Sequence, residues 1–131
     1  MKKILIVTAD YYKDITTSLI KSANNNLNKF STKIIKVPGV FEIPVVISKN
    51  IKKYDGFIAL GCVIKGETPH FDFIASSTIN AIMNLSIKST KPIGNGIITC
   101  LNKKQAIIRS NISKKDKGGE AAKAVISILN L

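Results

Sequence analysis

The 131-residue chain has few of the residues that build metal centres or disulfide frameworks. It contains two cysteines and one histidine, and Cys62 and Cys100 stand in separate apolar runs rather than in a C-x-x-C pair. This pattern predicts two reduced, buried thiols and no bound metal. No apolar stretch in the sequence approaches the roughly 20 residues of a transmembrane helix, so we expect no membrane association.

Acidic and aromatic residues are also scarce. Eight Asp and Glu stand against 20 Lys and Arg, giving a formal net charge of +12, and aromatic residues make up 6% of the chain. The positive charge favours a nucleic-acid partner. However, the lysines are scattered, no long basic run occurs, and few aromatics are present to stack on bases. We expect no nucleic-acid partner, and a salt titration with a nonspecific oligonucleotide would test that alternative.

Arginine occurs once, at position 109. The many Lys, Ile and Asn residues indicate an AT-biased coding sequence that uses lysine wherever a positive charge suffices. A guanidinium group can hold a phosphate in a planar fork that lysine cannot form. Arg109 is therefore a candidate phosphate ligand, with the chance survival of one arginine as the alternative.

Apolar periodicity predicts alternating strands and helices in a single domain over residues 1–131. The expected strands are Lys3–Thr8, Lys33–Val37, Phe57–Ile64 and Lys91–Leu101, and the expected helices are Ile15–Phe30, Ile43–Lys52, Phe71–Ser89, Lys103–Arg109 and Gly119–Leu131. We expect the last helix to bury Ala122, Val125, Ile128 and Leu129. Such an order favours an α/β fold with a four-stranded parallel sheet and helices on both faces.

The only histidine follows the third expected strand, in the segment G-C-V-I-K-G-E-T-P-H-F-D, Gly61 to Asp72. Ligands gather at the carboxyl ends of strands in open α/β sheets, and helix N-termini offer free N–H groups to anions. His70 is therefore a candidate for proton transfer near neutral pH. An ordinary surface histidine at a helix start is the alternative.

A second motif, V-P-G-V-F-E-I-P, runs from Val37 to Pro44 after the second expected strand. Pro38 and Gly39 predict a turn, and Pro44 fits the first turn of the next helix. Glu42 then stands on a stiff loop at a strand's carboxyl end. It either binds a ligand or complements the dipole of the following helix.

Together, these two motifs resemble those of the 6,7-dimethyl-8-ribityllumazine synthases of riboflavin biosynthesis. The resemblance extends from Ile4 to Ala122 in the same motif order. It implies a three-layer flavodoxin-like sandwich fold. It also implies an enzyme that condenses 5-amino-6-(D-ribitylamino)uracil with 3,4-dihydroxy-2-butanone 4-phosphate and uses no metal or organic cofactor. Since the attacking amine belongs to a substrate, the enzyme's part would be mainly orientation and proton transfer.

The resemblance also implies a role for each matching position. Tyr11 would stack on the uracil, Val40, Phe41 and Glu42 would hold the ribityl chain, and the backbone of Cys62, Val63 and Ile64 would read the uracil edge. Glu67 and Thr68 would bind the phosphate through backbone N–H groups with Arg109 as the cationic partner, His70 would transfer protons, and Asn95 and Lys117 would approach the substrates. For Tyr11 and Lys117 the alternative is a residue of a solvated loop.

Some positions depart from the family pattern. Asn95 stands where many members have an aromatic residue, and Asp10 replaces a frequent arginine. The chain lacks the extension that precedes the first strand in many relatives, so we expect homopentamers. The resemblance implies active sites shared between neighbouring subunits, and the composition predicts a small cytoplasmic enzyme. A sixty-subunit shell stays open as the alternative assembly.

The alternative function is a flavodoxin-like flavin or nucleotide binding protein without catalytic activity. The loop after the first expected strand disfavours it. That loop contains no glycine and carries Asp10 and Asp14, whereas a phosphate-wrapping loop would be rich in Gly, Ser or Thr.

Overall fold

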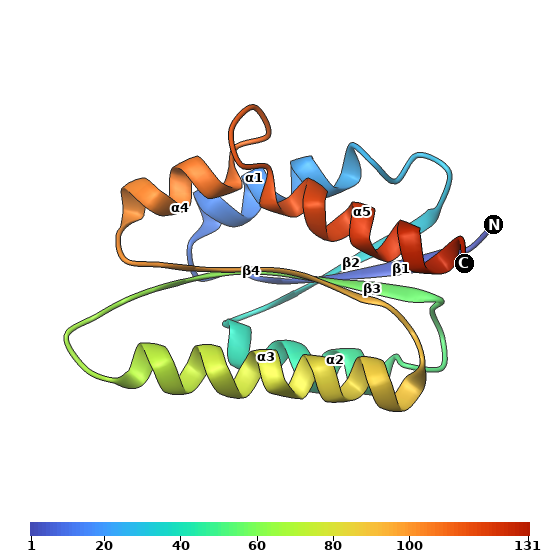
Figure 1. Cartoon of the computed structure of the whole chain (residues 1–131), viewed down its shortest axis with the longest axis horizontal. Coiled ribbons are helices and arrows are strands. Elements are labelled where there is room, and N and C mark those ends of the chain that lie inside the picture. The colour runs from blue at the N-terminus through green and yellow to red at the C-terminus, as the bar shows by residue number, and fades with distance from the viewer.

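Four parallel strands form the middle layer of the computed structural model, which describes residues 1–131 (Figure 1). The strands are β1 (Lys3–Ala9), β2 (Ser31–Val37), β3 (Gly56–Ile64) and β4 (Ile93–Cys100), in the order β2-β1-β3-β4. One face carries α1 (Lys13–Asn24), α4 (Lys103–Ser110) and α5 (Lys117–Leu129); the other carries the 3₁₀ turn η1 (Val40–Glu42), α2 (Ile43–Lys49) and α3 (His70–Ser89). The predicted three-layer flavodoxin-like fold is confirmed.

The hydrophobic core lies on both faces of this sheet. Successive side chains of a strand point to opposite faces, so Ile4 and Ile6 join the core beneath α1 and α5, while Leu5 and Val7 join the core above α2 and α3. All four side chains are fully buried. Helices on both faces explain why the central strands β1 and β3 are continuous apolar runs rather than alternating patterns.

Helix α5 packs closely on β4. A Cβ atom at Gly94 would collide with the carbonyl oxygen of Ala121 and with the side chain of Val125. The stripe of α5 that faces the sheet therefore follows Ala121, Val125 and the partly buried Leu129 at i, i+4 spacing. Ile128 lies beside this stripe and is 50% exposed, so the prediction that it is buried is wrong.

Helix α1 is shorter than predicted. It ends at Asn24 rather than at Phe30, within a run of three asparagines that have low helix propensity. The chain continues in turns, and the Nδ2 of Asn26 donates to the carbonyl oxygen of Ser22. Leu27 is nevertheless buried, because the turn folds its side chain back onto the core. The other predicted elements are present, with ends displaced by a few residues.

Because all strands are parallel, the loops that follow them meet at one edge of the sheet. These loops follow Ala9, Val37, Ile64 and Cys100. This edge therefore gathers both motifs noted in the sequence. None of the helices combines the length and hydropathy that a membrane span requires.

Candidate active site

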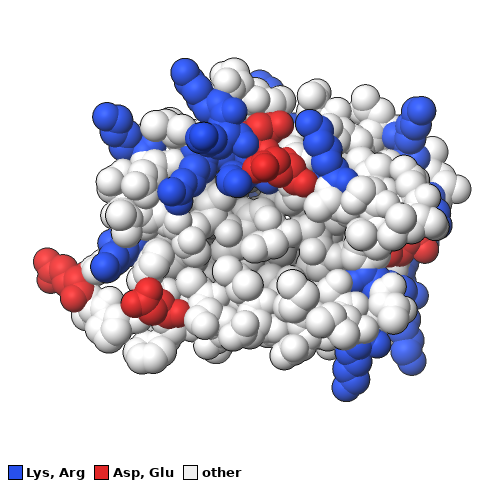
Figure 2. Space-filling view, in the orientation of Figure 1, with Lys and Arg blue, Asp and Glu red and all other residues white.

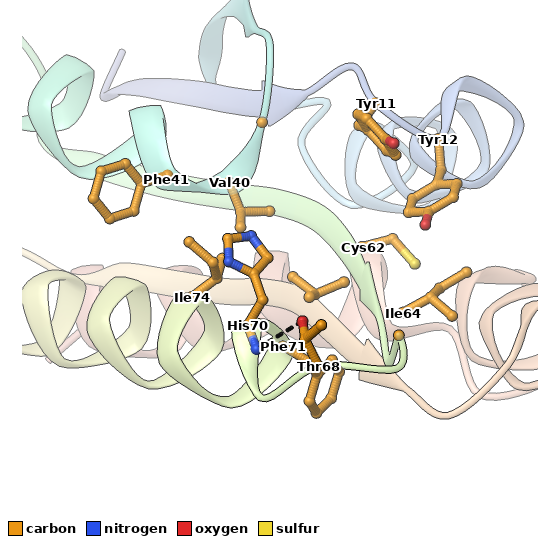
Figure 3. Close-up of a pocket in the computed structure, with 13 residues that line it drawn as sticks. Tyr11, Tyr12, Val40, Phe41, Cys62, Ile64, Thr68, His70, Phe71 and Ile74 are labelled. Atoms are coloured by element: carbon orange, nitrogen blue, oxygen red, sulfur yellow. Dashed lines mark hydrogen bonds between the residues drawn. The ribbon is translucent and has the colours of Figure 1, made fainter.

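A mainly apolar pocket of about 380 Å³ lies at this edge, between the loops after β1, β2 and β3 (Figure 3). Most of the expected site residues line it. They are Tyr11, Val40, Phe41, Cys62, Val63, Ile64, Thr68 and His70. The pocket is also lined by Tyr12, Gly39, Gly66, Phe71 and Ile74, which were not among the residues expected from the sequence. We call it the first pocket.

The mouth of the first pocket carries two exposed aromatic rings. Tyr11 is 76% exposed and Phe41 is 62% exposed. They come from different loops, after β1 and in η1, and Figure 3 shows them on opposite sides of the cavity. Exposed rings on a pocket rim provide apolar faces on which a flat ligand can stack.

His70 is the first residue of α3, and Pro69 precedes it as the N-cap. The backbone N–H of His70 donates to Oγ1 of Thr68 at 3.4 Å, a long bond (Figure 3). The His70 side chain is exposed and points into the first pocket on the side of Val40. The imidazole is therefore accessible to a ligand, and the start of a 20-residue helix lies beside it.

Glu42 is held by its own loop. Its Oε1 accepts a hydrogen bond from the backbone N–H of Gly39 at 3.0 Å, which closes η1, and Pro44 follows in the first turn of α2. Neither Glu42 nor Glu67 lines the first pocket: Glu42 turns back toward Gly39, and Glu67 is exposed in the loop before α3. One Glu42 carboxylate oxygen carries no hydrogen bond to Gly39.

Cys62 lies at the floor of the first pocket. The strand register pairs Cys62 with Ile98 and Ile64 with Cys100, so the two cysteines sit diagonally across β3 and β4 in the same core. Both are free thiols. Burial, and then the neighbouring Cys100, raise the pKa of the Cys62 thiol to about 12. The thiol is therefore a poor nucleophile at neutral pH.

A second pocket of about 450 Å³ lies along the outer edge of β4. It is lined by three further expected residues, Asn95, Arg109 and Lys117, together with Ile97, Ile98, Thr99 and Lys115. Glu42 and Glu67 line neither pocket. Three cationic side chains give it a positive charge. The second pocket shares no lining residue with the first.

The polar groups of the second pocket are already partly engaged. Nη1 of Arg109 donates to the carbonyl oxygen of Thr99 at 2.6 Å and lies 3.7 Å from Sγ of Cys100. Nζ of Lys117 lies 3.0 Å from Oε2 of Glu120. Oδ1 of Asn95 accepts from the backbone N–H of Ile97 at 3.0 Å, so this side chain satisfies a donor on the edge strand. Both Arg109 contacts involve Nη1, which leaves Nε and Nη2 as the donors available to a ligand.

The charges on the face that carries β4 are separated in space. Figure 2 shows Lys and Arg above and below a band with little charge, which crosses the middle of the face where β4 runs in Figure 1. The β4 sequence I-G-N-G-I-I-T-C contains no charged residue. β4 is an edge strand with unpaired backbone groups, and it has no charged side chain that would keep another chain away.

Comparison with known proteins agrees with the resemblance seen in the motifs. Residues 1–131 match the family described as 6,7-dimethyl-8-ribityllumazine synthase. Proteins of that name are 41% identical in Agrobacterium fabrum, covering 98% of this chain and 93% of the relative, and 42% identical in Zymomonas mobilis, covering 100% and 96%. A third, from Bartonella henselae, is 44% identical over 98% of this chain and 86% of its own length. This chain belongs to the 6,7-dimethyl-8-ribityllumazine synthase family.

Proposed function

We propose that this protein is a lumazine synthase that condenses 5-amino-6-(D-ribitylamino)uracil with 3,4-dihydroxy-2-butanone 4-phosphate and releases phosphate and water. The observation that carries the proposal is the family match over residues 1–131. The site geometry supports it, since the first pocket offers exposed rings and an accessible imidazole and the second offers cations.

The first pocket would hold the pyrimidine substrate. Tyr11 would stack on the uracil ring, and Val40, Phe41 and the free oxygen of Glu42 would hold the ribityl chain. The backbone at Cys62, Val63 and Ile64 would pair with the uracil edge. The Cys62 thiol itself takes no part, because its raised pKa keeps it neutral.

The phosphate would lie at the start of α3. Backbone N–H groups at Glu67 and Thr68 and the positive end of the helix attract an anion there. Arg109 would supply the cationic partner through the guanidinium donors that do not bond Thr99. Lys117 and Asn95 would complete this side of the site.

Proton transfer would fall to His70. The substrate amine attacks the ketone, so the reaction moves protons as water and phosphate leave. An accessible imidazole beside both substrates can accept and return them. Orientation of the two substrates would supply the larger share of the rate.

The two pockets of one chain share no residue, and we propose that they meet across a subunit interface. A cyclic homopentamer would place the first pocket of each copy against the second pocket of its neighbour, with the uncharged band along β4 inside the contact. A sixty-subunit shell would use the same contact. Native mass spectrometry would distinguish these assemblies, and fractionation of cells would test the expected cytoplasmic location.

The direct test is incubation of the purified protein with both substrates. Lumazine absorbance and inorganic phosphate should rise together, one phosphate per lumazine. Binding of flavin without product would instead favour the non-catalytic flavodoxin-like alternative.

A further inference from the structure

Tyr12 lies between the hydrophobic core and Tyr11. Its ring packs against the core cluster that contains Cys62, and it lines the first pocket. The Tyr11 and Tyr12 rings meet edge to face, with centroids 4.9 Å apart and planes at 80°. Tyr11 is 76% exposed, so the contact with Tyr12 ties a largely solvated ring to the core.

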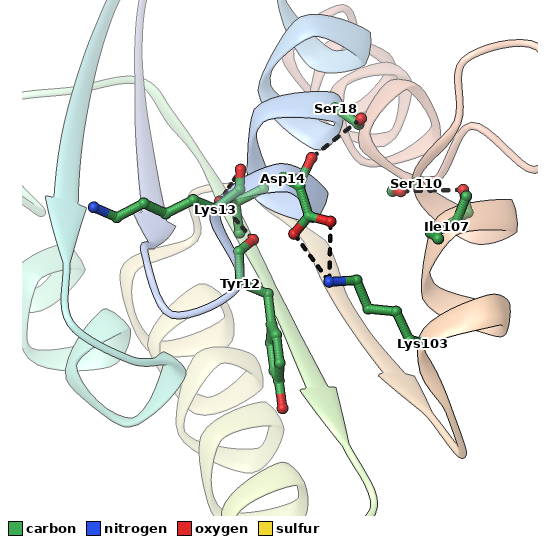
Figure 4. A network of polar contacts seen from close by, with 8 residues as sticks. Tyr12, Lys13, Asp14, Ser18, Lys103, Ile107 and Ser110 are labelled. Atoms are coloured by element: carbon green, nitrogen blue, oxygen red, sulfur yellow. Dashed lines mark hydrogen bonds and ion pairs between the residues drawn. The ribbon is translucent and has the colours of Figure 1, made fainter.

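Tyr12 also lies beside a cation that is itself held in place (Figure 4). Nζ of Lys103 lies 5.8 Å from the centroid of the Tyr12 ring, within the range of a cation–π contact. The same ammonium lies 3.0 Å from Oδ2 and 3.2 Å from Oδ1 of Asp14. Lys103 begins α4 and Asp14 is in the first turn of α1, so this pair links two helices beside Tyr12.

The backbone of Tyr12 is also fixed. Its carbonyl oxygen accepts from the backbone N–H of Thr16 at 3.0 Å and from Oγ1 of Thr16 at 3.2 Å. Burial is the largest cause of a raised pKa at the Tyr12 phenol, which therefore stays neutral at physiological pH. Tyr12 is thus a rigid, uncharged support, whereas Tyr11 has no such anchor of its own.

From this arrangement we infer that Tyr12 is a positioning residue, which orients the Tyr11 ring toward the pyrimidine substrate and is itself held by Lys103 and Asp14. The inference rests on the proposed function, in which Tyr11 stacks on the uracil. Without Tyr12, the Tyr11 ring would sample more orientations, and ordering it again would weaken binding of the flat substrate. The butanone phosphate, placed at the start of α3 in the proposed function, would make no contact with Tyr11.

The test compares three variants in steady-state kinetics. Tyr12→Leu should raise the KM for the uracil substrate about two- to tenfold, the range expected from loss of one aromatic pair, and leave the KM for the butanone phosphate unchanged. Tyr12→Phe keeps the ring and should behave as wild type. Tyr54→Leu is the matched control, because it removes a ring paired edge to face with Phe57 at 6.0 Å, at the opposite end of β3.

A second comparison tests the support of Tyr12. Lys103→Met should raise the same KM by a smaller factor, whereas Lys104→Met, at the next exposed lysine, should leave it unchanged. If Tyr12→Phe raises the KM for the uracil substrate as much as Tyr12→Leu does, the hydroxyl contacts the substrate and the positioning role is wrong. Equal KM increases for both substrates in Tyr12→Leu would also overturn it.

Ring NMR provides a readout that needs no activity. The chain has three tyrosines, so ring-labelled tyrosine gives a simple spectrum. Tyr11 resonances should move toward those of free tyrosine in Tyr12→Leu and stay in place in Tyr12→Phe. A wild-type protein that makes no lumazine would refute the proposed function, and unmoved Tyr11 resonances in Tyr12→Leu would refute the positioning role.

Discussion

At the scale of single residues, some side chains of the candidate site are exposed without a hydrogen bond to the protein, and others are hydrogen-bonded to its backbone. The His70 imidazole and the Tyr11 ring are exposed at the first pocket. Arg109 and Glu42 instead donate to or accept from backbone groups at Thr99 and Gly39. Substitution of the free residues should change kinetics alone, whereas substitution of the engaged ones should also change stability.

The first prediction concerns His70. His70→Ala should lower kcat by about 10²-fold or less, because a general acid–base group contributes less where orientation supplies most of the rate. Both KM values should stay near wild type. Asp72→Ala, an exposed substitution in the same helical turn, is the control and should be neutral. Unchanged turnover in a folded His70→Ala variant would remove the imidazole from the mechanism.

The second prediction concerns Arg109. Arg109→Lys keeps the positive charge but loses the planar guanidinium group, which can donate two hydrogen bonds to a phosphate. The KM for the butanone phosphate should rise about tenfold, as expected when one charged hydrogen bond is lost, while that for the uracil substrate changes little. The variant should also unfold at a slightly lower urea concentration, because its bond to Thr99 is lost. An equal rise in the KM for both substrates would mean that Arg109 has only a structural role.

Cys62 should resist alkylation in the native protein. Its pKa of about 12 leaves almost no thiolate at pH 8, so iodoacetamide should react slowly until urea unfolds the chain. The raised pKa of Cys62 also makes the stability of the protein depend on pH. Above about pH 9 the unfolded thiol ionises while the folded one does not, so the free energy of unfolding falls as pH rises toward 12. Rapid native alkylation of Cys62 at pH 8 would contradict this.

At the scale of elements, one lysine ties the turn before β3 to the start of β4. Nζ of Lys91 donates to the carbonyl oxygens of Ile51 and Tyr54 at 2.6 and 2.9 Å. Lys91→Met should lower the free energy of unfolding by about 1–3 kcal/mol, because two part-buried carbonyls lose a charged donor. Urea denaturation would measure it, with Lys88→Met on the exposed side of α3 as the control. Equal effects of the two substitutions would refute this role of Lys91.

Elements with strong periodicity were predictable from the sequence. The strand Phe57–Ile64 and the helix Phe71–Ser89 agree closely with β3 and α3, since a long apolar run or stripe leaves one way to bury it. The end of α1 was not predictable from apolar spacing alone. Leu27 continues the helical period yet is buried by a turn after the asparagines.

The parts of the candidate site that belong to sequence motifs were predictable from the sequence. The parts that depend on tertiary contacts were not. The loops with Val40 and His70 reach one pocket because parallel strands end at one edge. The bond from Arg109 to Thr99 and the packing of Tyr12 on Tyr11 depend on how α4 and the β1–α1 loop meet the sheet. The adjacent tyrosines at 11 and 12 were the only signal for that packing in the sequence.

At the scale of the whole molecule, the expected site residues divide between two separate surfaces. The first pocket faces the loops after β1, β2 and β3, and the second follows the edge of β4. Under the proposed function, a single chain would present two incomplete sites, which adjacent copies in a ring would join. The strand at the centre of the proposed contact has no charged side chain, so β4 itself adds none of the net charge of +12 to the contact.

Complementation between two inactive variants tests this division most directly. Tyr11→Ala combined with His70→Ala disables the first pocket, and both side chains are exposed, so the fold should tolerate the change. Arg109→Ala disables the second. The two variants would be unfolded, mixed in equal amounts and refolded together, with native mass spectrometry to verify mixed rings.

In mixed rings, half of the subunits keep an intact first pocket and half keep an intact second pocket. Since the two choices are independent at each interface, roughly a quarter of the interfaces should be wild type, and lumazine formation should recover toward that fraction of normal activity. Mixed rings that are no more active than the two variants measured apart would contradict a site shared between subunits.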